Sequence, residues 1–286
     1  MKKYFSLVLF SHSIFAMPFA LIGFFLAINT TQESFNWLKL ILVVLCMVFA
    51  RNSAMAFNRY LDRDIDAIND RTRDRDIPAG KIMPSEALIF TIINCILFVA
   101  ATFFINTLCF YLSPIALFVV LFYSYTKRFT PLCHFVLGLG LALAPIGAYL
   151  AVTGHFNIVP IFYSITVLFW VSGFDIIYAL QDEEFDRENK LHSIPVLLGK
   201  KNALRLSSVL HVVSAIAVTL PVFYIEVGWM YYIGLIFFYT MLIYQHLLVK
   251  PSDISRVNRA FATTNGYASV VFAVCFLLDI IIRYYI

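Results

Sequence analysis

Charged residues are scarce in this sequence, and their scarcity excludes a water-soluble globular protein. Asp, Glu, Lys and Arg make up only 13% of the 286 residues, whereas 61% are hydrophobic. A soluble domain of this size would contain about twice that charged fraction. Apolar runs of roughly 18 or more residues recur along the chain, and each is long enough to cross a bilayer as an α-helix. The composition therefore predicts an all-α membrane protein with many spans.

Several common functional signatures are also missing. The five cysteines are scattered through apolar runs without a CxxC pair, which argues against a disulfide framework or a zinc site. The six histidines lack the spacing of a metal-binding HExxH motif, and no P-loop is present. Nothing in the sequence indicates a nucleic-acid or protein partner, so the expected partners are the bilayer and small molecules.

Nine apolar segments are predicted to span the membrane, and residues 1–286 are expected to form one integral membrane domain. The predicted spans are residues 4–28, 37–60, 86–107, 109–125, 131–152, 158–181, 203–225, 228–249 and 261–283. Lysine and arginine are concentrated at the N-terminus and in the loops after the second, fourth, sixth and eighth spans. Because these residues favour the cytoplasmic side, we expect the N-terminus and these loops to face the cytoplasm from the inner (cytoplasmic) membrane.

Acidic residues gather where two of these spans end. The stretch NRYLDRDID places Asn58, Asp62 and Asp66 four residues apart, which on a helix puts all three side chains on one face. Asp182 and Asp186 repeat the same spacing where the sixth span ends. We therefore expect two DxxxD motifs to face each other at the cytoplasmic end of the bundle, as products of a weak internal duplication.

Carboxylates packed this closely repel one another and require a positive partner. Mg²⁺ prefers oxygen ligands, takes few carboxylates in most proteins and completes its shell with water and substrate phosphates. The motifs therefore predict Mg²⁺ sites and a diphosphate ligand; the proposed metal-binding residues are Asn58, Asp62, Asp66, Asp182 and Asp186. Because the chain has no nucleotide-binding loop, a lipid diphosphate is favoured.

Basic residues beside the motifs could bind the phosphate oxygens. YSYTKRFT places Tyr123, Lys127 and Arg128 at the end of the fourth span. The loop after the first motif supplies further candidates, namely Arg71, Arg73, Arg75 and Lys81. Ordinary anchoring of basic residues at the membrane surface is the alternative, and it is favoured for Arg73 and Lys81.

Arg51 differs from these residues because it lies inside a predicted span. It precedes Asn58 by seven residues, which places it about two helical turns deeper on the same face. A buried arginine in a membrane helix is costly and marks a functional position unless an anion compensates it. The anion could be a group on a substrate or the carboxylate of Asp175, which precedes Asp182 by the same seven residues.

Three stretches resemble the signatures of a known family. RNSAMAFNRYLDRDIDAINDRTRDRDIPAG resembles the first aspartate signature of the UbiA family of intramembrane aromatic prenyltransferases. YSYTKRFT is similar to the Tyr-x3-Lys motif of that family, and DIIYALQDEEFDRENKLHSIPVLLGK to its second aspartate signature. The resemblance covers nearly the whole chain, with the motifs in the family order, and is greatest to the 4-hydroxybenzoate polyprenyltransferases.

The resemblance implies a reaction and roles for individual residues. A polyprenyl group would pass from its diphosphate to an aromatic acid, 4-hydroxybenzoate, in ubiquinone biosynthesis, through Mg²⁺-dependent ionisation and electrophilic substitution. Arg51 would bind the aromatic carboxylate, while Asp66 or Asp182 would assist loss of a proton. The ring of Tyr123 or Tyr178 would shield the allylic cation.

Two departures from the family pattern leave the acceptor open. Arg59 follows the motif asparagine where aspartate is usual, and Asp76 stands where proline is common. Prenylation of a dihydroxynaphthoate in menaquinone synthesis is therefore an alternative. An ion-coupled transporter is an alternative of a different class, but transporters usually carry such carboxylates near the bilayer midplane on broken helices.

Overall fold

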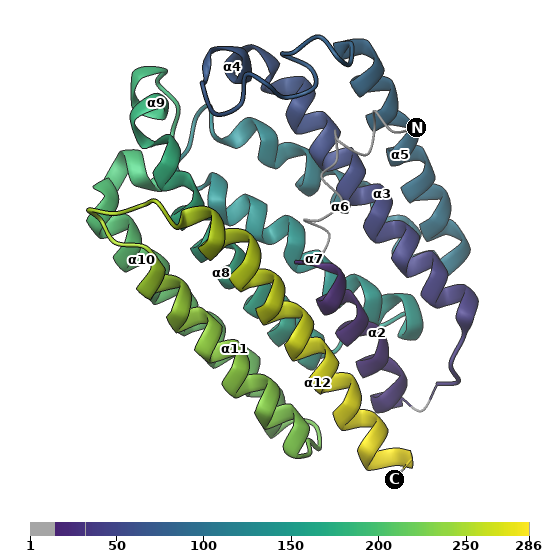
Figure 1. Ribbon diagram of the computed structural model, residues 1–286. Coiled ribbons are helices and arrows are strands. Elements are labelled where there is room, and N and C mark those ends of the chain that lie inside the picture. The colour runs from purple at the N-terminus through teal and green to yellow at the C-terminus, as the bar shows by residue number, and fades with distance from the viewer. Residues whose placement is uncertain (1–14, 32, 286) are drawn as a thin grey trace.

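The computed structural model describes residues 15–31 and 33–285, which form a bundle of helices (Figure 1). The long helices are α2 (Met17–Thr31), α3 (Trp37–Leu61), α5 (Pro84–Ile105), α6 (Thr107–Thr126), α7 (Cys133–Thr153), α8 (Ile158–Ala179), α10 (Ile194–Thr219), α11 (Trp229–Leu248) and α12 (Asn265–Tyr285). Two short helices, α4 (Arg63–Ile68) and α9 (Glu183–Glu188), follow α3 and α8. Within the described residues, eight helical segments are long and apolar enough to cross a membrane. The predicted all-α membrane fold is confirmed.

Eight of the nine predicted spans coincide with these segments. The first prediction, residues 4–28, begins outside the described residues, and most of its described part lies in the 15-residue apolar helix α2. The seventh span starts earlier than predicted, because α10 begins at Ile194 rather than near residue 203. Ser193 caps this helix, and Gly199 kinks it at φ 71° and ψ 162°. Gly199 thus separates a short helical piece that begins at Ile194 from the longer helix that begins after it, about three residues before the predicted start of the span.

The helices are arranged so that α2, α7 and α8 occupy the middle of the bundle (Figure 1). Helices α3, α5 and α6 pack together on one side, and α10, α11 and α12 lie on the other (Figure 1). Helix α7 contacts α2, α6 and α8, and thus joins the two sides. The two motif-bearing helices, α3 and α8, therefore stand on either side of the space capped by α4 and α9.

Large aromatic side chains fill the core between α2, α8, α11 and α12. Trp170, Phe19, Phe238 and Phe272 are fully buried, and their rings contact one another. Burying such side chains removes a large apolar area from water or lipid and fixes the helix spacing. This aromatic core gives the polar end of the bundle a rigid support.

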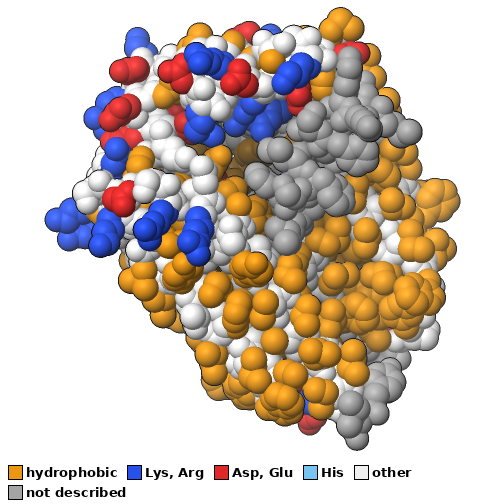
Figure 2. Space-filling model, viewed as in Figure 1, with side chains coloured by type: hydrophobic (Ala, Val, Ile, Leu, Met, Phe, Trp, Pro, Cys, Tyr) orange, Lys and Arg blue, Asp and Glu red, His pale blue; other side chains and the backbone are white. Residues whose placement is uncertain are grey.

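Charged side chains gather at one end of the molecule, whereas the visible sides are mostly hydrophobic (Figure 2). Helices α4 and α9 and their loops form that end (Figure 1). A charged end above apolar sides is the surface expected of a bundle that crosses a bilayer. The chain is therefore an integral membrane protein, while the assignment of the charged end to the cytoplasm stays a prediction.

Candidate active site

A polar cavity of about 210 Å³ lies under the charged end of the bundle. Its wall contains all five predicted metal-binding residues, namely Asn58, Asp62, Asp66, Asp182 and Asp186. Tyr123, Lys127 and Arg128 of the α6 end also line it, as do Arg71 and Tyr178. The structure thus brings together at one cavity two sequence regions that are more than a hundred residues apart.

The two aspartate motifs have matching local backbone geometry. Asp62 lies between the end of α3 at Leu61 and the start of α4 at Arg63, and has φ −90° and ψ 5°. Asp182, between α8 and α9, has φ −102° and ψ 4°. This sparsely populated conformation is common among active-site residues. Each motif therefore bends the chain at its first aspartate, while the internal duplication stays a prediction.

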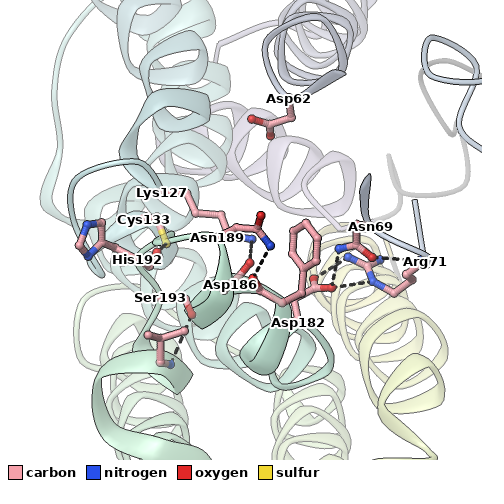
Figure 3. A network of polar contacts seen from close by, with 12 residues as sticks. Asp62, Asn69, Arg71, Lys127, Cys133, Asp182, Asp186, Asn189, His192 and Ser193 are labelled. Atoms are coloured by element: carbon pink, nitrogen blue, oxygen red, sulfur yellow. Dashed lines mark hydrogen bonds and ion pairs between the residues drawn. The ribbon is translucent and has the colours of Figure 1, made fainter. Parts of the chain in front are cut away.

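Each of the four motif carboxylates forms an ion pair with a different basic residue. The pairs are Asp62 with Arg128 (2.9 Å), Asp66 with Arg75 (2.6 Å), Asp182 with Arg71 (2.5 Å) and Asp186 with Lys127 (2.7 Å). Arg71 binds both oxygens of Asp182 (Figure 3). It also donates to the hydroxyl of Tyr178 at 3.1 Å. These pairs compensate the carboxylate charge within the protein.

Burial shapes the electrostatics of these pairs. Burial raises the pKa of Asp62 above its ordinary value, although the Arg128 guanidinium opposes this shift. Burial alone would lower the pKa of Lys127, but the carboxylate of Asp186 raises it above the ordinary lysine value. The Asp186 residue is 0% exposed, so its charge depends strongly on Lys127.

The donor set suits a divalent cation, although the carboxylates do not converge on one point. Within the described residues, no three acidic, histidine or cysteine side chains are close enough to hold a metal ion, and Asp62 lies apart from Asp182 and Asp186 (Figure 3). In the same part of the chain, Asp66 Oδ2 and Asp186 Oδ2 are buried and accept no hydrogen bond. Such oxygens are the ligands that Mg²⁺ takes. The individual metal ligands stay a prediction.

An apolar cavity of about 430 Å³ adjoins the polar one. It runs between α2, α3, α5, α6 and α7 and is lined mainly by aliphatic side chains. Tyr123 and Leu137 line both cavities and therefore form their common wall. Arg51 lines the apolar cavity and points one donor at the sulfur of Met55, 3.0 Å away. A cationic group is thus present in a cavity that otherwise suits a hydrocarbon chain.

Asp175 has a different partner from the one considered from the sequence. Its carboxylate contacts Nδ1 of His134 at 2.7 Å, rather than forming a pair with Arg51. His134 was assigned no role by spacing, because its partner is 41 residues away on another helix. Arg59 is a second residue that spacing did not assign, and its guanidinium lies 4.0 Å from Asp66. The contacts of His134 and Arg59 with these aspartates arise from the folded structure and could not be found from sequence spacing.

Comparison with known proteins agrees with this architecture. The profile of the UbiA prenyltransferase family matches residues 16–273. A 4-hydroxybenzoate octaprenyltransferase of Methylococcus capsulatus is 31% identical over 232 residues, which cover 81% of this chain and 79% of that protein. A protein of the same name from Vesicomyosocius okutanii is 29% identical over 248 residues, covering 86% and 90%.

Solved structures of similar fold include two UbiA homologues. The apo structure of a UbiA homologue from Aeropyrum pernix K1 has a TM-score of 0.84 and 29% identity, covering 94% of this chain and 98% of that one. A UbiA homologue from Archaeoglobus fulgidus, bound to GPP and Mg²⁺, has a TM-score of 0.73 at 21% identity, covering 97% and 99%. At that identity the second likeness concerns the fold alone.

Proposed function

Because the chain belongs to the UbiA prenyltransferase family, we propose that this membrane-embedded prenyltransferase moves a polyprenyl group from its diphosphate to the ring of 4-hydroxybenzoate, in ubiquinone biosynthesis. The observation that carries the proposal is the junction of the two cavities. A carboxylate- and cation-lined cavity suits a diphosphate, and the adjoining apolar cavity suits its hydrocarbon tail. Their common wall at Tyr123 and Leu137 is where the carbon–oxygen bond of the donor would lie.

Mg²⁺ is the proposed cofactor, and the five polar residues of the two motifs are its proposed ligands. The buried carboxylate oxygens that accept no hydrogen bond within the described residues support this choice, as does the Mg²⁺ in the Archaeoglobus fulgidus homologue. When bound, the metal would neutralise charge on the leaving diphosphate. Asn58 already donates to Asp62 at 2.9 Å and would orient that carboxylate.

The basic residues would bind the phosphate oxygens that the metal leaves free. Lys127, Arg128 and Arg71 border the cavity and now contact carboxylates. Guanidinium and ammonium groups form charge-assisted hydrogen bonds with phosphate as readily as with carboxylate. Each could therefore exchange one anionic partner for another without becoming unpaired. Tyr178, which already accepts a hydrogen bond from Arg71, would hold that arginine in place.

The acceptor would bind through Arg51. A planar guanidinium matches an aromatic carboxylate in a bidentate contact, and the apolar walls around it would strengthen that contact by excluding water. Tyr123 lies close enough to Arg51 to interact with it electrostatically. A ring held at Arg51 would therefore reach the cavity junction, where the ring face of Tyr123 would also shield an allylic cation.

The test is a product assay on purified protein in detergent with Mg²⁺, GPP and either 4-hydroxybenzoate or a dihydroxynaphthoate carboxylic acid. We expect prenylated 4-hydroxybenzoate by mass spectrometry, and a loss of at least about a hundredfold in Asp62→Ala, where a charge-neutralising ligand is removed. Arg51→Ala should mainly raise the KM for the acceptor. Asp64→Ala is the matched control for the motif, since its side chain is 83% exposed.

The outcomes separate the parts of the proposal. Product from the naphthoate alone would replace the acceptor and keep the chemistry. Diphosphate release without any aromatic product would contradict the aromatic acceptor. Metal-independent turnover would contradict the Mg²⁺ assignment. Membership of a prenyltransferase family, together with carboxylates placed at helix ends, favours this reaction over ion-coupled transport.

A further inference from the structure

Asp175 differs from the other four aspartates that line the polar cavity. Those four form ion pairs with lysine or arginine, whereas the carboxylate of Asp175 contacts Nδ1 of the His134 ring at 2.7 Å. The Asp175 side chain is 21% exposed, so part of its carboxylate remains open to the cavity. Within the described residues, no lysine or arginine forms an ion pair with the Asp175 carboxylate.

The hydrogen bonds of His134 define its protonation. The backbone N–H of Ile194 donates to His134 Nε2 at 3.3 Å, a contact that favours the neutral ring with a free electron pair on that nitrogen. The ring proton therefore lies on Nδ1, from which it is donated to Asp175. His134 is 3% exposed and fixed on both sides, so it orients the carboxylate. A neutral donor fixes Asp175 without cancelling its negative charge.

Asp175 also lies at the depth where the acceptor would react. It lies on α8, seven residues before Asp182, which corresponds to about 10 Å of helical rise, just as Arg51 precedes Asn58 on α3. Tyr123, in the common wall of the two cavities, is near enough to Asp175 for an electrostatic interaction. Asp175 therefore lines the polar cavity in the neighbourhood of the wall that this cavity shares with the apolar one.

We propose that Asp175 is the catalytic base that removes the ring proton of the acceptor, and that His134 is its positioning residue. The inference rests on the proposed aromatic prenylation. The allylic C–O bond breaks with its electron pair leaving on diphosphate, and a ring π pair forms the new C–C bond. Asp175 then takes the proton from the substituted ring carbon, and the C–H electron pair restores the aromatic ring.

Charge explains why Asp175 suits this role better than the motif aspartates. Asp182 is bound through both oxygens by Arg71, and Asp66 lies between Arg75 and Arg59. A positive partner stabilises the ionised carboxylate and so weakens it as a base. The neutral His134 stabilises the ionised carboxylate of Asp175 much less, so Asp175 remains able to accept a proton.

The test compares Asp175→Asn with wild-type full-length protein, using GPP, Mg²⁺ and 4-hydroxybenzoate that is either unlabelled or deuterated at both ring positions beside the hydroxyl. Product formation and diphosphate release are measured separately. General-base removal predicts that product formation falls by about a hundredfold or more, while diphosphate release falls less. The kcat ratio of unlabelled to deuterated acceptor should rise above the wild-type ratio, because proton removal becomes slow.

Variants of His134 provide a second, independent test, which addresses its role in positioning Asp175. His134→Ala should raise the isotope ratio in the same direction, and His134→Gln, whose amide can still donate, should recover part of the rate that alanine loses. Asp279→Asn is the matched control: it removes a buried carboxylate of α12 outside both cavities and should leave the isotope ratio at the wild-type value.

An unchanged isotope ratio in Asp175→Asn would overturn the proposal, as would equal losses of product formation and diphosphate release. If the isotope ratio rose in Asp66→Asn or Asp182→Asn instead, the base would be that residue. Failure of wild-type protein to prenylate the acceptor while it releases diphosphate would refute the proposed function, which is a distinct outcome.

Discussion

Removing the charge of Lys127 tests whether this residue compensates a buried carboxylate in the metal-free protein. Lys127→Met keeps most of the side-chain length but leaves Asp186, which is 0% exposed, without its ion-pair partner at 2.7 Å. Breaking one side of a buried pair costs about 3–5 kcal/mol. The penalty has an upper limit, because the variant can fold with Asp186 protonated. Protonating an ordinary aspartate at pH 7 costs about 4 kcal/mol.

The prediction has a definite sign with respect to pH and metal. Each unit of lower pH makes protonation about 1.4 kcal/mol cheaper, so the penalty at pH 5 should fall to about 1.5 kcal/mol. The stability of the variant relative to wild type should therefore decrease as pH rises from 5 to 7. Added Mg²⁺ should stabilise the variant more than wild type, because a bound cation would replace the missing charge.

Thermal unfolding in detergent, followed by tryptophan fluorescence with EDTA or Mg²⁺, provides the measurement. A loss of about 4 kcal/mol corresponds to a Tm lower by roughly 10 °C. Lys200→Met is the matched control: its Nζ lies 3.9 Å from Glu183, a looser contact expected to contribute less than about 1 kcal/mol. Equal Tm values for the two variants in EDTA at pH 7 would refute the reasoning, as would a penalty that grows at pH 5.

Two further predictions concern the support of the site. Gly23→Ala should sharply reduce the yield of folded protein, because the new Cβ would lie 2.0 Å from the carbonyl oxygen of Pro145. The control Gly147→Ala should be tolerated, because its new Cβ would meet no atom within 4 Å. Similar size-exclusion profiles for the two variants would contradict this prediction. Asp279→Asn should lower stability by about 2–4 kcal/mol, because Asp279 accepts from the backbone at the start of α11 and from Arg283, yet activity per folded molecule should persist. A thermal scan alongside the product assay checks it, and an unchanged Tm would count against this capping role.

Local periodicity predicted the fold and much of the candidate site. Span length and hydropathy depend on neighbouring residues alone, so eight of the predicted spans agree with helices in the described residues. The spacing of Asn58 and Asp62 predicted a shared helix face, and their side chains are joined by a hydrogen bond of 2.9 Å. Two residues four positions apart on a helix lie close together because of helix geometry alone, whatever the rest of the chain does.

Tertiary partners could not be predicted in this way. Asp175 and Arg51 are placed at matching depths by sequence, but the packing of α7 against α8 brings His134 to Asp175 instead. The short helical piece at the start of α10 was missed because it is separated from the spanning helix by the non-helical backbone of Gly199. The partner that a buried charged side chain contacts depends on which helices pack together, and the spacing of residues along one helix does not encode this packing.

Charge balance explains how so many ionised groups fit inside one end of a membrane protein. Five aspartates line the polar cavity, and within the described residues five cations stand against four of them, since Arg59 and Arg75 both approach Asp66. With His134 neutral, the formal charge of this group is zero. Desolvating a net charge would cost far more than desolvating matched pairs. An aspartate at position 59, usual in the family this chain resembles, would leave two uncompensated negative charges, so Arg59 makes the metal-free site of this chain neutral.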